Sequence, residues 1–159
     1  MKSIILLSIF ISTLFAQINF KETRHMEALD LDRDMFGNLE FNDEQMVVTY
    51  TKPNQQTITY HDDKITILRA EELKEYTFEQ YPQAQYMGLI LKAIIQDNYT
   101  LLDELFSQTV ANTKVDLVAK PVISNVMDHI SITKKEDKSI KNILITMTNK
   151  DTIHIEIID

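Results

Sequence analysis

The 159-residue sequence contains no cysteine, and it has only two glycines and three prolines. Without cysteine the chain forms no disulfide, so a sufficient hydrophobic core must hold the fold together. The same absence excludes a thiol nucleophile and a thiolate metal site. Because Gly37 and Gly88 are the only glycines, a glycine-rich loop that cradles phosphate cannot be built.

Positive charge is also scarce, since the formal net charge is −8. An acidic surface repels nucleic acid and anionic membranes, so we expect no nucleic-acid partner. The hydrophobic fraction of 44% is ordinary for a globular protein, and the length suits one compact domain. These values favour a soluble protein that we expect to be a monomer.

The first sixteen residues predict a secretory signal peptide. Lys2 supplies a positive start, residues 4–15 are mostly apolar, and Ala16 is a small residue at the expected cleavage site. A membrane anchor and a buried N-terminal strand are the competing interpretations, but the run is shorter than the ~20 residues that a span needs. We therefore expect an exported, periplasmic domain of residues 17–159, with a net charge of −9 and no cysteine for lipid attachment.

Between Phe36 and Leu68, apolar and polar residues alternate with a period of two in several short runs. This alternation predicts strands with one buried face. The polar corners between the runs are too short for a crossover helix, so neighbouring strands should be antiparallel. One face of this meander carries the large side chains of Leu39, Phe41, Met46, Val48, Tyr50, Ile58, Tyr60, Ile65 and Ile67.

The remaining chain follows an order of sheet, helices and sheet. Residues 18–28 predict a mostly polar strand, either at a sheet edge or half exposed, and residues 30–34 predict a turn. A helix over residues 83–96 is apolar around most of its circumference, which indicates burial on two sides. A second short helix is expected over 100–106, followed by alternating strands to the C-terminus.

Motifs for catalysis or metal binding are weak. Asp30, Asp32 and Asp34 match the opening of an EF-hand loop, but Met35 stands where glycine is required and Phe41 where glutamate is required. The sequence His61-Asp62-Asp63 is typical of a turn, and the four histidines show no metal-binding spacing. We therefore expect no enzymatic activity, no metal and no cofactor.

The apolar face of the meander offers another function. The helix, over Ala84 to Ile95, brings Met87, Ile90, Leu91 and Ile94 as a lid above that face. A cavity between them would bind acyl chains through burial worth about 0.8 kcal/mol per methylene. The alternative is that these side chains form only a dry core.

Several short stretches of the sequence together indicate a known family. They are FKETRHMEALD (residues 20–30), then Gly37, Leu39 and Phe41, then Met46, Val48, Tyr50 and Pro53, and finally Asp62, Asp63 and Lys64. With these stretches the sequence resembles the periplasmic outer-membrane lipoprotein carrier LolA and the LolA-like family, and the resemblance covers the mature chain in the order of its elements. The sequence departs from the carrier in two ways, because no arginine stands near Asn42 or Asp43 and Val48 replaces a tryptophan.

The resemblance implies a half-open antiparallel barrel with helices covering the concave apolar face, within a mainly β fold. It implies a periplasmic carrier that takes the acyl chains of lipoproteins or other lipids from an inner-membrane transporter to an outer-membrane acceptor. It also implies that Met46 and Val48 belong to the cavity. The alternative function is a structural or accessory subunit of an envelope lipid or glycolipid export assembly.

Overall fold

The computed structural model describes residues 17–41 and 45–158, in which eleven strands form one antiparallel sheet. The predicted signal peptide and the Asn42–Asp43 position lie outside the described residues. The strand order is β6-β5-β4-β3-β2-β1-β11-β10-β9-β8-β7. The strands are β1 (Gln17–Met26), β2 (Leu31–Phe41), β3 (Met46–Lys52), β4 (Gln56–Tyr60), β5 (Lys64–Arg69), β6 (Glu72–Thr77), β7 (Phe106–Ala111), β8 (Lys114–Ala119), β9 (Met127–Lys134), β10 (Ile140–Met147) and β11 (Thr152–Ile158).

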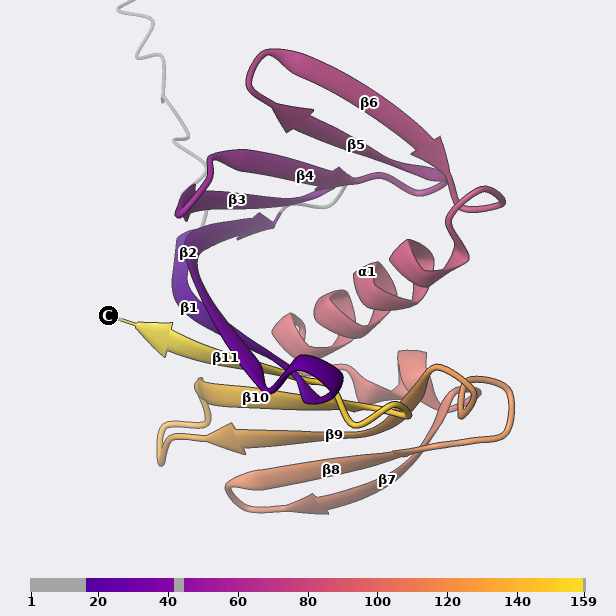
Figure 1. The fold of residues 1–159 in the computed structure, drawn as a ribbon. Coiled ribbons are helices and arrows are strands. Elements are labelled where there is room, and N and C mark those ends of the chain that lie inside the picture. Colours follow the sequence, from indigo (N-terminus) through magenta and orange to yellow (C-terminus); the bar gives the residue numbers. More distant parts are fainter. Residues whose placement is uncertain (1–16, 42–44, 159) are drawn as a thin grey trace, which may run out of the picture.

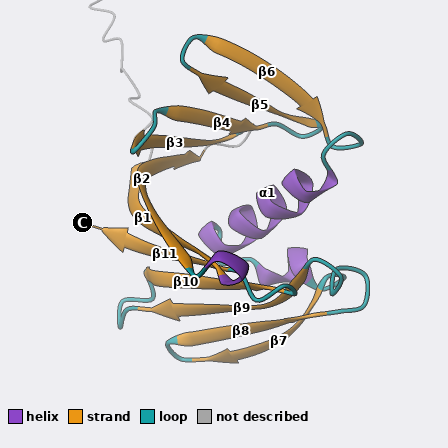
Figure 2. Ribbon diagram, in the orientation of Figure 1, coloured by secondary structure: helices purple, strands orange, loops and turns teal. Residues whose placement is uncertain are grey.

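The sheet curves around the single α-helix of the described chain, α1 (Pro82–Ile95), as Figure 1 shows. Pro82 suits the first turn, where no backbone N–H is needed. A 3₁₀ helix, η1 (Glu27–Leu29), joins β1 to β2, and another, η2 (Tyr99–Leu102), follows α1 (Figure 2). The second predicted helix is thus one short turn, because Phe106 already belongs to β7.

The two ends of the described chain meet in the middle of the sheet, where β1 pairs with β11 on one side and with β2 on the other. The predicted sheet-edge position of residues 18–28 is therefore wrong, whereas the half-exposed alternative is confirmed, because several residues of β1 are only partly buried. Strands β1–β6 form an N-terminal wing and β7–β11 a C-terminal wing. Among the described strands, β6 and β7 each have one neighbour, so the sheet stays half-open as predicted.

Short connections explain the antiparallel order within each wing. The predicted meander is confirmed as strands β2 to β5, whose neighbours pair antiparallel, with one register shift between Phe36 and Gly37 in the β2–β3 pair. The predicted turn over residues 30–34 is shorter, because only Asp30 adopts a left-handed conformation, with φ 46°, and β2 begins at Leu31. Asp32 and Asp34 instead contact His25 and Lys21 of β1.

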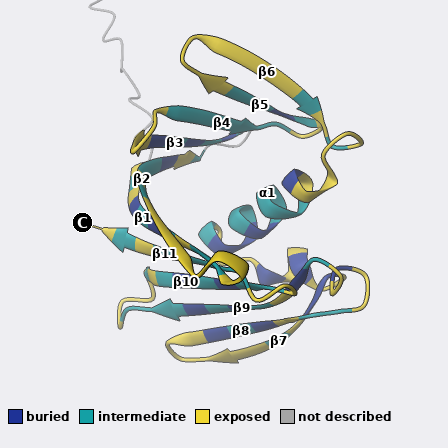
Figure 3. Ribbon diagram, in the orientation of Figure 1, coloured by how far each residue is buried: buried dark blue, intermediate teal, exposed yellow. Residues whose placement is uncertain are grey.

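The wings bury their apolar faces differently (Figure 3). Fifteen buried residues from β7–β10, α1, η2 and the η2–β7 and β8–β9 connections form the C-terminal core. The N-terminal core has five buried residues on β1–β3, with partly buried side chains packed around them. Helix α1 contributes to both, since Ile90 and Ile94 belong to the C-terminal core and Leu91 packs against the N-terminal one.

Candidate functional site

A central cavity of about 380 Å³ lies between the concave face of the sheet and α1. This volume is within the range of about 300–1,000 Å³ typical of small-molecule sites. Most of the lining is aliphatic or aromatic, from both wings and from the helix. The apolar lining residues are Ile18, Phe20, Leu39, Val48, Tyr50, Ile58, Tyr60, Met87, Leu91, Ile94, Ile95, Ile140, Ile143, Ile145, Ile153, Ile155 and Ile157.

Eight of the twelve predicted cavity residues line this central cavity. Strand pleating explains their convergence, because alternate residues of β2, β3 and β4 point to the same face. The helical residues reach the cavity from the opposite side. Their role in binding lipid stays a prediction. The eight residues are Leu39, Val48, Tyr50, Ile58, Tyr60, Met87, Leu91 and Ile94.

The other four predicted residues lie elsewhere on the concave side. Phe41 and Met46 line a smaller pocket of about 200 Å³ near the start of β3. Met46 is only 3% exposed and belongs to the N-terminal core, so it is better placed to hold the sheet together than to face a ligand. Ile65 and Ile67 of β5 line a second large space, described below.

Sequence reasoning missed the isoleucines that the C-terminal strands bring to the cavity. Ile153, Ile155 and Ile157 of β11 alternate with residues on the other face, so their shared direction was visible in the sequence. Their meeting with β1 was not visible, because the pairing of Phe20 with Ile157 joins opposite ends of the chain. The cavity is therefore built where the two wings join.

One polar cluster is set into the cavity wall. Glu22 is 3% exposed and accepts a hydrogen bond of 2.7 Å from the Tyr50 hydroxyl. The Arg24 guanidinium forms an ion pair with the same carboxylate through Nε. Burial raises the pKa of Tyr50, and the neighbouring Glu22 carboxylate raises it further, so the hydroxyl remains a donor. A buried carboxylate held by two donors is the stable arrangement of such a charge.

A second space of about 520 Å³, here called the arginine groove, adjoins the central cavity. It shares with that cavity a set of six lining residues. The groove also reaches the ends of β2, β4 and β5, where Arg33, Gln56 and Arg69 lie. The shared residues are Arg24, Tyr50, Ile58, Tyr60, Met87 and Ile153.

Tyr60 stands at the junction of all three spaces, because it lines the central cavity, the arginine groove and the smaller pocket. Helix α1 comes closest to it at Gly88, where an added Cβ would lie 2.8 Å from Cδ1 of the Tyr60 ring. Burial raises the pKa of Tyr60 to about 12, and Glu22 adds to this shift. Gly88 therefore lets the helix lie directly on the N-terminal wing.

The other end of the central cavity is polar. Asp97 follows α1, and its carboxylate lies 2.5 Å from Nζ of Lys134 on β9. The hydrogen bond from Lys134 lowers the pKa of Asp97. The Lys134 side chain is only 9% exposed, and its ammonium lies 5.2 Å from the Tyr99 ring centroid. These contacts fix the C-terminal end of α1 against the C-terminal wing.

The chain is similar to several solved structures, one of which is a mycobacterial protein. The crystal structure of LprF from Mycobacterium bovis superposes with a TM-score of 0.44 at 10% sequence identity, covering 91% of this chain and 85% of that one. No protein-family model matches the sequence, and no curated protein does. Within residues 17–41 and 45–158, no helix has both the length and the apolar character to cross a membrane.

Proposed function

We propose that this chain is a carrier that shields the acyl chains of lipoproteins or other lipids within its central cavity. The observation that carries the proposal is the apolar space of about 380 Å³ between α1 and the concave sheet. Protein interiors are close-packed, with few voids larger than a water molecule. A space of this size is therefore more typical of a binding site than of a dry core.

The chemistry of the lining supports an acyl ligand. The aliphatic side chains of Val48, Ile58 and Leu91 make apolar contacts that do not depend on orientation. Such contacts suit a flexible hydrocarbon chain. Met87 adds a flexible thioether that adapts to different chains. No covalent step is needed, so the protein acts by binding and release rather than as an enzyme.

The route that we propose is transfer across the periplasm, from an inner-membrane transporter to an outer-membrane acceptor. It rests on the predicted signal peptide of residues 1–16 and on the sequence resemblance to the LolA-like carriers. The second candidate function is an accessory subunit of an envelope export assembly. That function requires the wings to pack without a ligand between them, which the central cavity disfavours.

The test is to isolate the mature protein from the cell envelope and to identify bound lipids by mass spectrometry. We expect acylated molecules in stoichiometric amounts, and competition between fatty acids and the neutral apolar dye Nile red. Protein that is always empty and never binds the dye would contradict the carrier proposal and favour the accessory subunit.

A matched pair of variants tests whether the ligand binds in the central cavity. Leu91→Glu puts a charge in the central cavity and should abolish dye binding, because an unpaired charge is costly in an apolar site. Leu73→Glu makes the same change at a position that is 66% exposed on β6, and it should bind normally. If Leu91→Glu unfolds the protein, Leu91→Trp fills the cavity without adding charge and should still reduce binding. Normal dye binding by a folded Leu91→Trp variant would contradict the site.

A further inference from the structure

The chain contains only three arginines, Arg24, Arg33 and Arg69, and all three line the arginine groove. Among its described lining residues there is no aspartate or glutamate, although the chain has 24 acidic residues. A protein with a net charge of −8 thus concentrates its guanidinium groups around one concavity. Solubility alone does not explain why the three guanidinium groups gather around this groove.

The sheet register places two of these charges side by side. Arg24 of β1 and Arg33 of β2 are direct cross-strand partners, and both line the groove. Like charges directly opposite each other on neighbouring strands are destabilising. Arg24 is partly compensated by Glu22, whereas Arg33 forms no ion pair with any residue that the structure describes. An anion between them would remove the repulsion.

The third arginine is held in position from a more distant strand. Arg69 of β5 donates from Nε to Oε1 of Gln56 on β4 at 3.1 Å, and its Nη2 contacts the same oxygen. A neutral amide orients the guanidinium without cancelling its charge. The planar guanidinium forms paired hydrogen bonds with phosphate or carboxylate oxygens, which makes arginine the preferred residue for such anions.

The acidic residues of β2 do not neutralise the groove. Asp32 and Asp34 lie on the other face of this strand from Arg33, because successive side chains alternate. Their carboxylates already have partners, since Asp32 contacts His25 and Asp34 forms an ion pair with Lys21 at 3.0 Å. The concave face of β2 therefore presents a cation at the end where its convex face presents anions.

From this arrangement we infer that the arginine groove binds the anionic headgroup, phosphate or carboxylate, of an amphiphile whose acyl chain occupies the adjoining central cavity. The two spaces share Arg24, Tyr50 and Met87 among their lining residues, so they adjoin, as binding of one molecule with a polar and an apolar end requires. The inference rests on the proposed function and narrows its cargo to anionic lipids.

The test compares three probes in competition with Nile red and by calorimetry. The probes are 1-oleoyl lysophosphatidic acid, 1-oleoylglycerol, which has the same chain without phosphate, and glycerol 3-phosphate, which has the headgroup without the chain. We expect the phosphate-bearing amphiphile to bind about tenfold or more tightly than the neutral one, as charge-assisted hydrogen bonds predict. Glycerol 3-phosphate alone should bind weakly.

Two variants test whether the arginine groove causes the difference in affinity between the two amphiphiles. The double substitution Arg33→Gln with Arg69→Gln should lower the affinity for lysophosphatidic acid about tenfold and leave that for oleoylglycerol within about twofold. The control, Lys74→Gln with Lys141→Gln, removes two charges that line none of the three spaces and should change neither affinity appreciably. Circular dichroism verifies that both variants are folded.

Each other outcome overturns a defined part of the account. Equal affinity for both amphiphiles, unchanged in the arginine variant, overturns the headgroup site and leaves the carrier function standing. Failure of both amphiphiles to bind overturns the carrier function and this inference with it. Tight binding of glycerol 3-phosphate alone would identify a free-anion site, and an equal loss in the lysine control would identify only a long-range charge effect.

Discussion

The two wings have similar strand patterns but differ in how their apolar faces are covered. In the C-terminal wing, α1 and η2 close the face, and Val115, Leu117 and Ile130 are fully buried. In the N-terminal wing, the equivalent face of β4 is only partly covered, and Ile58 and Tyr60 remain half-buried. The same alternation of apolar and polar residues along the strands thus produces a closed core in one wing and a cavity wall in the other.

The helix explains this difference. Its residues Ile90, Ala93 and Ile94 are at most 1% exposed and belong to the C-terminal core. Leu91 and Ile95, on another side of the helix, pack against the N-terminal core and line the central cavity. The helix is therefore packed into the closed core of one wing, while other side chains of the same helix form part of the cavity wall at the other wing.

The largest expected effect is a difference in stability between substitutions in the two wings. Ile130→Ala in the closed core should lower the free energy of unfolding by about 2–5 kcal/mol. Ile58→Ala in the cavity wall should lower it by about 1 kcal/mol or less, because that side chain is already partly exposed. Denaturant titration measures both values, and Nile red binding should fall only for Ile58→Ala. Equal stability losses would contradict the division into core and cavity wall.

An intermediate effect concerns the contact of the helix with the N-terminal wing. Gly88→Ala should gain up to about 1 kcal/mol of helix propensity, but its new Cβ would lie 2.8 Å from the Tyr60 ring. We expect no net gain in the native background and a gain of about 1 kcal/mol in a Tyr60→Ala background, where the ring is absent. Thermal unfolding of the four proteins gives the coupling. Additive effects would show that α1 does not rest on Tyr60.

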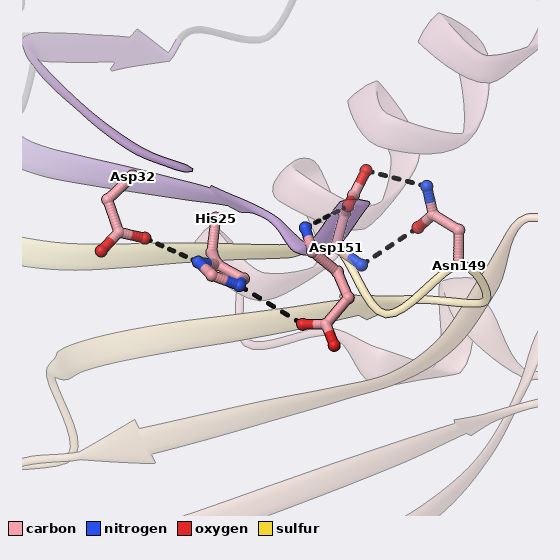
Figure 4. Close-up of polar contacts among 5 residues, drawn as sticks. His25, Asp32, Asn149 and Asp151 are labelled. Atoms are coloured by element: carbon pink, nitrogen blue, oxygen red, sulfur yellow. Dashed lines mark hydrogen bonds and ion pairs between the residues drawn. The ribbon is translucent and has the colours of Figure 1, made fainter. Parts of the chain in front are cut away.

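The smallest expected effect concerns the junction of the wings (Figure 4). The ring of His25 lies 2.8 Å from Asp32 and 3.3 Å from Glu27, while the Glu27 backbone N–H donates to Asp151 in the β10–β11 turn. The hydrogen bond with Asp32, aided by Glu27, raises the pKa of His25 above its ordinary 6.5. Protonated His25 therefore adds stability below that ordinary value, and this contribution is lost as pH rises through the raised pKa.

His25→Asn tests this contribution. The melting temperature of the native protein should fall slightly more between mildly acidic and mildly alkaline pH than that of the variant. The effect should be small, because the group is exposed to solvent. If the melting temperatures of the two proteins depended on pH in the same way, His25 would make no measurable contribution to stability at the junction.

Much of the fold could be predicted because it depends on local patterns. The alternation between Phe36 and Leu68 predicted the meander, and the apolar surface of residues 83–96 predicted a helix buried on two sides. The central position of β1 could not be predicted in this way. The charges of Glu22 and Arg24 suggested a strand at a sheet edge or half exposed, but Tyr50, far along the chain, satisfies the buried carboxylate of Glu22.

The candidate site was predictable to a similar extent. Residues on one face of the meander converge, which is a property of the pleat. The separation of Met46 from the central cavity depends on where α1 lies across the sheet, and no local pattern reveals that. The meeting of Arg24, Arg33 and Arg69 depends on the curvature and register of β1 to β5, so the count of three arginines alone did not predict a groove.

The central claim is that an acyl chain lies between the N-terminal wing and α1. A fatty acid with a photoreactive group along its chain can be bound, activated and located by peptide mass spectrometry. The account predicts labels on β3, β4 and α1, at residues such as Val48, Ile58 and Leu91. Labels confined to the convex face, or spread over exposed residues such as Leu73 and Val110, would contradict it.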